Sequence, residues 1–222
     1  TRKSPYIILN SENLNLYFQQ FFFGDVKISI SHIPILANDL LGYIKPTLGL
    51  NKKCIVLDLD NTLWGGIVGE DGFNKIKLGP QPPGNTYVEF QKYLLSLHER
   101  GIILAVNSKN NFDDAIKVIK EHPNMILKED NFACVRINWN DKVAHMKEIS
   151  DELNIVLYSM VFVDDDPVNI EYVSSNLPEI SSIHMPADNC HDNSRHLKLI
   201  SPLFNVLKIT DEDKARNRMY LE

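Results

Sequence analysis

Short apolar runs alternate with longer segments of mixed polarity through most of the chain. An apolar run of roughly four to eight residues bounded by turn residues is typical of a buried parallel strand. These runs predict strands at 54–59, 102–106, 132–137, 160–164 and 180–184. The segments between them predict helices at 84–100, 111–121, 141–153 and 167–176. Strands that alternate with helices indicate an α/β fold with a doubly wound parallel sheet.

The first fifty residues do not follow this alternation. They contain aromatic clusters, including three adjacent residues at Phe21 to Phe23, and a pattern that predicts a helix near Ile35 to Ile44. Adjacent Phe residues are costly to leave exposed. We therefore expect residues 1–50 to form a small N-terminal flank packed on the core, and residues 51–222 to form the main domain.

Two carboxylates stand one residue apart at the end of the first predicted strand. Asp58 and Asp60 follow an apolar run and are followed by Thr62. Strand alternation places Asp58 and Asp60 on the same side, so their charges need a divalent cation, a shared proton or both. A strand that merely ends in an acidic turn is the plainer interpretation, but it does not explain the Thr two residues on. Because open α/β sheets bind ligands at this edge, the segment indicates a functional site.

A second apolar run ends in three consecutive carboxylates, Asp164, Asp165 and Asp166, and Pro167 then suits the first turn of a helix. Two acidic strand ends in one parallel sheet imply carboxylates that converge on a common edge. Oxygen ligands of this kind suit Mg²⁺, which keeps several waters and is completed by substrate phosphate. A Ca²⁺ loop is the rival, but the regular Asp spacing and central Gly of an EF-hand are absent.

Two further polar pieces lie between these acidic strand ends. The strand predicted at 102–106 leads into Asn107, Ser108 and Lys109, and Lys142 stands at the start of the helix predicted at 141–153. A hydroxyl group and an ammonium group at such positions can hold the oxygens of a phosphoryl group. Taken singly, Ser108 is as well explained by a helix cap and Lys142 by a solvated side chain. Their order after the acidic strand end favours the functional interpretation of both.

Together the four pieces resemble the haloacid-dehalogenase superfamily of aspartyl phosphotransferases, whose motifs are a DxD strand, a Ser/Thr strand end, a Lys and an acidic strand end. Longer segments are similar to the FkbH-like family: DLDNTLWGGIVGEDG (58–72), GIILAVNSKNN (101–111), INWNDK (137–142) and VFVDDDPVN (161–169). The segment WGG with GEDG is the more specific part. The sequence departs from the family where Asp166 replaces Asn, and where Asn169 and Ile170 replace a Glu-Arg pair, so we expect substrate detail to differ from the family's.

The resemblance implies a haloacid-dehalogenase-like Rossmannoid domain that loads a glyceryl unit in polyketide assembly. It implies 1,3-bisphosphoglycerate as donor and the phosphopantetheine thiol of an acyl carrier protein as acceptor. The chain begins at Thr1 without an initiator Met, so we expect an excised piece of a modular polyketide synthase. The acyl group delivered and the parent assembly line are not fixed by the sequence.

The resemblance also implies roles for single residues. Asp58 would attack phosphorus, Asp60 would act as general acid and base, and Ser108 and Lys142 would stabilise the transferring oxygens. The expected Mg²⁺ ligands are Asp58, the backbone carbonyl of Asp60, Asp164 and, as a helper, Asp165. The expected substrate contacts are Thr62, Trp64, Gly65, Gly66, Asn107 and Lys109.

The spacing of the motifs leaves no room for a separate cap domain. The interval from Asp60 to Ser108 accommodates a flap (Leu63 to Gly79) and one helix, and the interval from Ser108 to Lys142 accommodates a helix and a strand. We therefore expect a capless, open site from which a large substrate, a carrier protein or the flap excludes water.

An enzyme cysteine could in principle carry the acyl group first. Cys54 begins the first strand, roughly 13 Å from Asp58 by strand rise, and Cys134 lies within a strand. Cys190 follows the last predicted strand and has His191 beside it. None is placed next to Asp58 by the sequence, so we favour direct transfer to the carrier thiol. The alternatives are a plain Mg²⁺-dependent phosphatase of a phosphorylated acid or protein, and a catalytically inactive domain that docks carrier proteins.

Length, charge and cysteine content limit the domain size, the partners and the compartment that we expect. The chain has 222 residues, enough for one α/β domain with a sizeable core. Lys and Arg total 23 against 29 for Asp and Glu, and this net charge of −6 argues against a nucleic-acid partner. Three cysteines without a CxxC pair fit a reducing, cytoplasmic setting. No apolar stretch reaches the roughly 18 residues of a membrane span, and the N-terminus does not look like a signal peptide.

Overall fold

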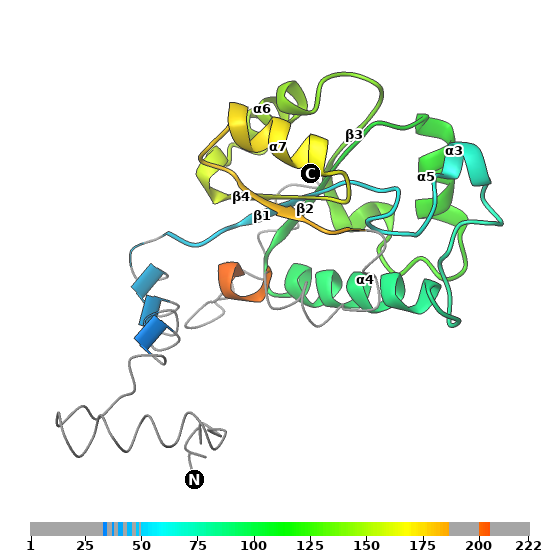
Figure 1. Cartoon of the computed structure of the whole chain (residues 1–222), viewed down its shortest axis with the longest axis horizontal. Coiled ribbons are helices and arrows are strands. Elements are labelled where there is room, and N and C mark those ends of the chain that lie inside the picture. The colour runs from blue at the N-terminus through cyan, green and yellow to red at the C-terminus, as the bar shows by residue number, and fades with distance from the viewer. Residues whose placement is uncertain are drawn as a thin grey trace, which may run out of the picture.

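The computed structural model describes residues 50–186 and 200–204 together with scattered residues between 33 and 48. Its centre is a five-stranded, all-parallel sheet with strand order β3-β2-β1-β4-β5 (Figure 1). The strands are β1 (Cys54–Leu57), β2 (Ile103–Ser108), β3 (Phe132–Ile137), β4 (Met160–Asp164) and β5 (Ser181–His184). The predicted α/β class and the doubly wound parallel sheet are confirmed, and β1 lies in the middle of the sheet.

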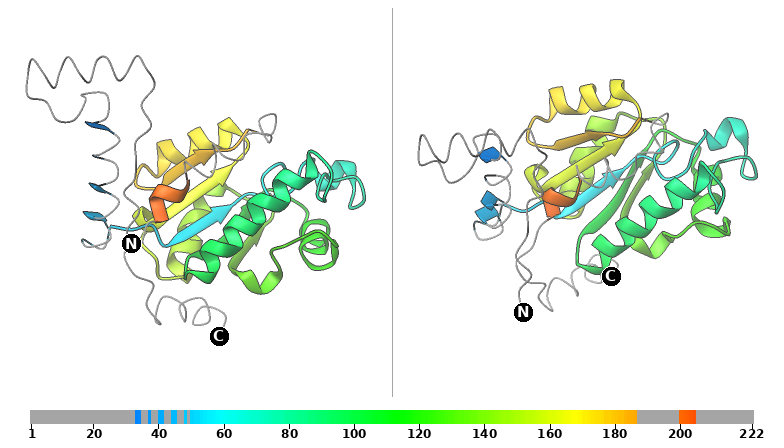
Figure 2. Two further views of the ribbon diagram at one scale, coloured as in Figure 1. Left: turned by 90° about the horizontal axis from the view of Figure 1, so that it is seen from below. Right: turned by 60° about the horizontal axis from the view of Figure 1, so that its bottom comes forward.

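Helices cover both faces of this sheet, as both views in Figure 2 show. The α-helices are α3 (Val68–Asp71), α4 (Gly84–Glu99), α5 (Phe112–Glu121), α6 (Lys142–Glu152) and α7 (Pro167–Asn176). Short 3₁₀ helices are η2 (Glu129–Asn131), η3 (Leu157–Ser159) and η5 (Ser201–Phe204). Apart from α3 and the 3₁₀ helices, each helix begins and ends close to its predicted bounds.

Alternate residues of β1 point into two separate hydrophobic clusters. Ile55 and Leu57 pack in the cluster that contains the buried residues of α4 and α5. Cys54 and Val56 pack in the cluster that contains the buried residues of α6 and α7. Because both faces are covered, all four residues of β1 are apolar, and the strand appears in the sequence as an unbroken run.

The register of the strands fixes which residues meet at the edge that carries the site. Leu57 pairs with Val106 on one side and with Val163 on the other. The backbone N–H of Asp58 then donates to the carbonyl of Val163 at 2.9 Å. The residues that follow these three strands therefore leave the sheet side by side.

The segment between β1 and α4 is anchored to the core. Gly65 and Lys77 exchange antiparallel backbone hydrogen bonds, and the short helix α3 lies between them. Its buried apolar residues belong to the cluster that covers the α4 face: Leu63, Trp64, Val68, Ile76 and Leu78. Within residues 50–186, no separate cap domain interrupts the chain between Asp60 and Lys142, as the spacing predicts.

The flanks of this core are described only in part. The described residues between 33 and 45 are helical, in agreement with the helix expected near 35–44, and their apolar side chains Ile33, Leu40, Leu41 and Ile44 are exposed. Phe21 to Phe23 lie outside the described residues, as does the C-terminal part of the main domain beyond residue 204. In the part of the chain that the structure describes, no helix has the length and apolar character needed to cross a membrane.

Candidate active site

A buried lysine joins two strand ends at the carboxyl edge of the sheet. Lys142 Nζ donates to Asp58 Oδ1 at 2.7 Å and to Asp164 Oδ2 at 2.5 Å. Asp58 follows β1, Asp164 ends β4, and Lys142 begins α6, whose N-cap Asp141 accepts from the backbone N–H of Ala144. All three bridging side chains are buried, so these ion pairs lie largely out of solvent.

The carboxylates of this cluster outnumber its cations. Asp58, Asp164 and Asp165 each offer an oxygen within 4.8 Å of the others, and Lys142 supplies one positive charge. Burial raises the pKa of Asp58 to about 6; Lys142 opposes this shift and Asp164 adds to it. Burial and the charges of Asp58 and Asp164 raise the pKa of Asp165 to about 7. A divalent cation would compensate this excess, and oxygen-only donors fit Mg²⁺.

Lys142 itself stays charged in this surrounding. Burial alone would lower its pKa, but the carboxylates of Asp58 and Asp164 outweigh burial and raise the pKa above its ordinary value. The side-chain amide of Asn107 donates to the backbone carbonyl of Lys142 at 3.0 Å, and its oxygen lies 3.1 Å from Nδ1 of His145. Asn107 is fully buried. Direct substrate contact by Asn107 stays a prediction; in the structure its side chain bonds to Lys142 and His145 in the first turns of α6.

Asp60 faces a different set of partners. Its Oδ1 accepts from the indole N–H of Trp64 at 2.7 Å and from the backbone N–H of Val68 at 3.1 Å. Its Oδ2 accepts from the side-chain amide of Asn110 at 2.8 Å. Burial raises the pKa of Asp60, although these three donors favour its ionised form. The carboxylate is thus held in one orientation, apart from the cluster around Lys142.

Three residues expected to touch substrate, Thr62, Trp64 and Gly65, are buried in the segment between β1 and α4. Trp64 and Thr62 are fully buried, and the only polar atom of the Trp64 side chain is bound to Asp60. A Cβ on Gly65 would lie 2.8 Å from the ring of Tyr87, so this position needs Gly to fit against α4. Direct substrate contact by Thr62, Trp64 and Gly65 therefore stays a prediction; the structure shows that Trp64 holds Asp60 and that Gly65 fits against α4.

The remaining predicted residues lie at the rim or beside Asp58. Gly66 has a φ of 95° and a Cβ there would meet Asp71 Oδ2 at 2.4 Å, so its backbone requires Gly. Ser108 is buried, and its side-chain hydrogen bond to Asp58 favours the ionised carboxylate. Lys109 is exposed and free to meet a ligand from solvent.

Sequence reasoning missed two residues at this edge. Asn110 is buried and holds Asp60, and the exposed Trp139 precedes α6 in the loop after β3. A signal for Asn110 exists in the sequence, because it follows Ser108 by two residues at a strand end that already carries chemistry. Trp139 has a weaker signal: a large aromatic residue in a polar loop between a strand and Lys142.

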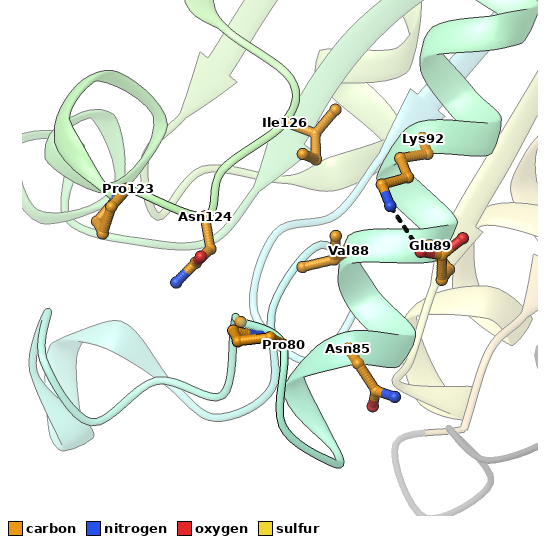
Figure 3. Close-up of a pocket in the computed structure, with 9 residues that line it drawn as sticks. Pro80, Asn85, Val88, Glu89, Lys92, Pro123, Asn124 and Ile126 are labelled. Carbon is orange, nitrogen blue, oxygen red and sulfur yellow. Dashed lines mark hydrogen bonds and ion pairs between the residues drawn. The ribbon is translucent and has the colours of Figure 1, made fainter.

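Two of the cavities on the described part of the molecule are relevant to these residues. One, of about 470 Å³, adjoins Asn110 and Trp139. The other, of about 500 Å³, lies between the start of α4 and the loop around Asn124, with the Lys92–Glu89 ion pair at its wall (Figure 3). None of Asp58, Asp164 and Asp165 lines either cavity; the first one approaches the site through Asn110, which bonds to Asp60.

The comparison with known families agrees with this geometry. The family of NLI interacting factor-like phosphatases matches residues 53–216. The chain belongs to this family. The match places it in the haloacid-dehalogenase-like superfamily, as the four motifs predict, and it does not reach the finer FkbH-like assignment.

A solved structure supports the family and the fold. The N-terminal part of the protein BF1531 from Bacteroides fragilis, described as containing a phosphatase domain complexed with Mg, is 33% identical with a TM-score of 0.78. The alignment covers 88% of this chain and 52% of that structure, so the chain spans about half of its length. An uncharacterised protein from Corynebacterium glutamicum is 11% identical with a TM-score of 0.41, covering 67% of this chain and 95% of that one. No curated protein matches the chain.

Proposed function

We propose that the chain is a Mg²⁺-dependent phosphatase of the haloacid-dehalogenase type in which Asp58 is the nucleophile. The observation that carries this proposal is the buried cluster of Asp58, Lys142, Asp164 and Asp165 at the carboxyl edge of the sheet. Family membership and a Mg-bound relative support it. Asp58, Asp164 and Asp165 would hold the ion, with the backbone carbonyl of Asp60. The ion would neutralise charge on the phosphoryl group.

The chain's own groups carry the two steps. A carboxylate oxygen of Asp58 attacks phosphorus, the bond from phosphorus to the leaving oxygen breaks, and Asp60 gives that oxygen its proton. A water then passes a proton to Asp60 and attacks phosphorus, which breaks the bond to Asp58 and releases phosphate. Lys142 and Ser108 stabilise negative charge on the transferring oxygens. Burial favours the protonated form of Asp60 that the first step needs.

The finer proposal is glyceryl transfer. It rests on the four sequence segments that resemble FkbH-like domains. The enzyme would take 1,3-bisphosphoglycerate, remove its ester phosphate at Asp58, and bring its acyl phosphate to the phosphopantetheine thiol of an acyl carrier protein. The thiol sulfur attacks the acyl carbon, the carbon–oxygen bond to phosphate breaks, and the thiol proton is lost to solvent. The acyl phosphate is already activated, so alignment of the thiol is the main requirement.

The described cysteines favour direct transfer to the carrier. Cys54 is fully buried, and burial together with the nearby Cys134 raises the pKa of its thiol. Burial raises the pKa of Cys134 to about 12. A protonated, enclosed thiol is a poor nucleophile, so neither residue is suited to carry an acyl group. Cys190 lies outside the described residues.

A plain phosphatase that acts on a phosphorylated acid or protein uses the same cluster, and the family match favours it as the second candidate. An inactive docking domain is disfavoured because a fold that only docks has no need for three buried carboxylates and a buried lysine. Both alternatives are separated from glyceryl transfer by what happens to the carrier.

The test combines two readouts in one reaction. The chain is incubated with Mg²⁺, 1,3-bisphosphoglycerate and a holo carrier protein, and intact-mass spectrometry of the carrier is run beside an assay of released phosphate. Glyceryl transfer predicts a carrier heavier by one glyceryl group, together with phosphate release. Phosphate release with an unchanged carrier identifies the plain phosphatase. Neither product, from wild type and Asp58→Asn alike, would contradict the enzyme proposal.

A further inference from the structure

The cavity of about 470 Å³ opens at the carboxyl ends of β2 and β3. Its apolar wall is formed by Phe112, Ile137 and Trp139. Phe112 is 52% exposed and Trp139 is 70% exposed, whereas Ile137 is buried. Two exposed aromatic side chains that line the same cavity form an apolar patch of the kind that marks a ligand-binding groove. A volume of this size suits a small organic group.

A series of hydrogen bonds connects this wall to Asp60. The indole N–H of Trp139 donates to Asn111 Oδ1 at 3.1 Å. The backbone N–H of Asn111 donates to Asn110 Oδ1 at 2.9 Å, and the Asn110 amide donates to Asp60 Oδ2 at 2.8 Å. The exposed indole is thus held in place rather than free to turn, and its position is tied to that of the carboxylate.

Asn111 is the N-cap residue of α5, but its side chain makes no capping hydrogen bond to the backbone of the helix. Instead it accepts from Trp139 and donates to Asp114 Oδ2 at 3.3 Å. Asn and Asp side chains at an N-cap usually bond to the helix backbone. The side chain of Asn111 bonds instead to Trp139 and Asp114, two residues that line the cavity.

The charges around the cavity restrict what it accepts. Its polar lining consists of three amides, Asn110, Asn111 and Asn138, and two carboxylates, Asp113 and Asp114. No lysine or arginine lines it among the described residues. Carboxylates without a facing cation repel an anionic ligand, whereas amides and aromatic faces accept an uncharged one.

We propose that this cavity is the leaving-group subsite, and that it takes an uncharged organic body with an apolar face, joined through oxygen to the phosphate. The proposal rests on the proposed function, because Asp60 is the acid that protonates the leaving oxygen. The group that departs from phosphorus must lie on the Asp60 side, and Asn110 belongs both to the wall of the cavity and to the hydrogen bonds of Asp60. A second phosphate or a carboxylate on the substrate points elsewhere.

A matched set of phosphate esters tests the charge preference. Methyl phosphate has no body to fill the cavity, benzyl phosphate has an uncharged ring, and 4-carboxybenzyl phosphate has the same ring with a negative charge. We expect kcat/KM for benzyl phosphate to exceed that for methyl phosphate by about tenfold, and to exceed that for the carboxylated ester by a similar factor. An equal or higher value for the carboxylated ester would overturn the proposal.

Two variants test whether the cavity causes the preference for an uncharged ring. Trp139→Ala should bring the benzyl-to-methyl ratio of kcat/KM close to one. Val168→Ala is the matched control: this side chain is 71% exposed at the start of α7, beyond β4 and on the other side of the central strand. It should keep the wild-type ratio. If Trp139→Ala also keeps the ratio, the indole does not contact the leaving group and the proposal fails.

A binding measurement separates failure of this inference from failure of the proposed function. The chain has two Trp residues, of which Trp64 is fully buried and Trp139 is exposed, so acrylamide quenching of indole fluorescence reports on Trp139 at the cavity. Benzylphosphonate, which cannot be hydrolysed, should protect this indole from acrylamide in wild type with Mg²⁺ more strongly than 4-carboxybenzylphosphonate. Protection without turnover of any ester would keep the subsite and reject the phosphatase. Turnover of the esters without protection would do the reverse.

Discussion

The two sides of the active site differ in the charge, the burial and the structural position of their residues. On the phosphoryl side, Asp58, Lys142 and Asp164 are charged, buried and fixed at strand and helix ends. On the leaving-group side, Asn110 and Trp139 are uncharged and belong to loops, and Trp139 is mostly exposed. Asp60 links the two sides: it follows Asp58 by two residues, and its carboxylate accepts from the side-chain amide of Asn110.

This difference follows from what each side has to recognise. A phosphoryl group and a Mg²⁺ ion present the same charges in every substrate, so their partners must be charged and held rigidly. Buried charges in turn need partners, which forces the residues into a fixed arrangement. A leaving group differs from one substrate to another, and amides with aromatic faces in loops can be varied without disturbing the sheet. The phosphoryl side thus specifies the reaction, and the other side specifies the substrate.

The largest expected effect comes from the nucleophile. Asp58→Asn should lower phosphate release by roughly a thousandfold or more for every ester, because it removes the attacking oxygen common to all of them. Thermal unfolding followed by circular dichroism checks that the variant is folded. Near-normal phosphate release from folded Asp58→Asn protein would show that Asp58 is not the nucleophile. The charged cluster around Lys142 would then not be the phosphoryl side of the active site.

The contrast between buried charged residues and uncharged loop residues also explains how much of the molecule was predictable from its sequence. The strands and main helices were predicted within about two residues, because a sheet covered on both faces needs apolar runs throughout. The cluster of Asp58, Ser108, Lys142, Asp164 and Asp165 was also predicted, since charged residues at strand ends require a reason. Their meeting at one edge is confirmed by the structure; their roles stay predictions.

The flap and the leaving-group side were predicted less well, for a physical reason. An Asn after a strand or a Trp in a loop has several ordinary explanations, so the sequence favours Asn110 only by its place two residues after Ser108, and favours Trp139 more weakly still. Trp64 was predicted to lie in a flap and to contact substrate, and its full burial was not predicted. Its burial depends on contacts with α3 and α4, which local sequence does not contain.

The next effect concerns the counter-charge of the phosphoryl side. Lys142→Met leaves buried carboxylates without their ammonium partner, so the free energy of unfolding in the absence of metal should fall by about 3–5 kcal/mol. Because Mg²⁺ would replace part of the lost positive charge, added Mg²⁺ should raise the stability of Lys142→Met more than that of wild type. Urea unfolding with Mg²⁺ or with a chelator measures both quantities.

Lys109→Met is the stability control for this variant. Lys109 is exposed, and its replacement should change the free energy of unfolding by no more than about 0.5 kcal/mol. If Lys142→Met were as stable as Lys109→Met in the presence of chelator, the lysine would not balance the carboxylates and the charge argument for the metal would lose its basis.

A smaller effect distinguishes neighbouring carboxylates. Activity should vanish with a chelator, and Asp164→Asn should raise the Mg²⁺ concentration for half-maximal activity by roughly tenfold or more, because Asp164 belongs to the converging oxygens. Asp166→Asn should change it little. Asp166 caps α7 by accepting from the backbone N–H of Val168, and Asn preserves that cap. A larger shift for Asp166→Asn in a metal titration would reverse this assignment.

The smallest expected effect sharpens the comparison most, because it should depend on the leaving group. Asn110→Ala removes one of three donors that orient Asp60, so kcat/KM for an alkyl phosphate should fall about tenfold. With acetyl phosphate the loss should be slight, since acetate leaves without needing a proton from Asp60. Asn140→Ala, an exposed Asn of the neighbouring loop, serves as control for both substrates. An equal loss with both substrates would mean that Asn110 supports the phosphoryl side as well, and that the two sides of the site do not act separately.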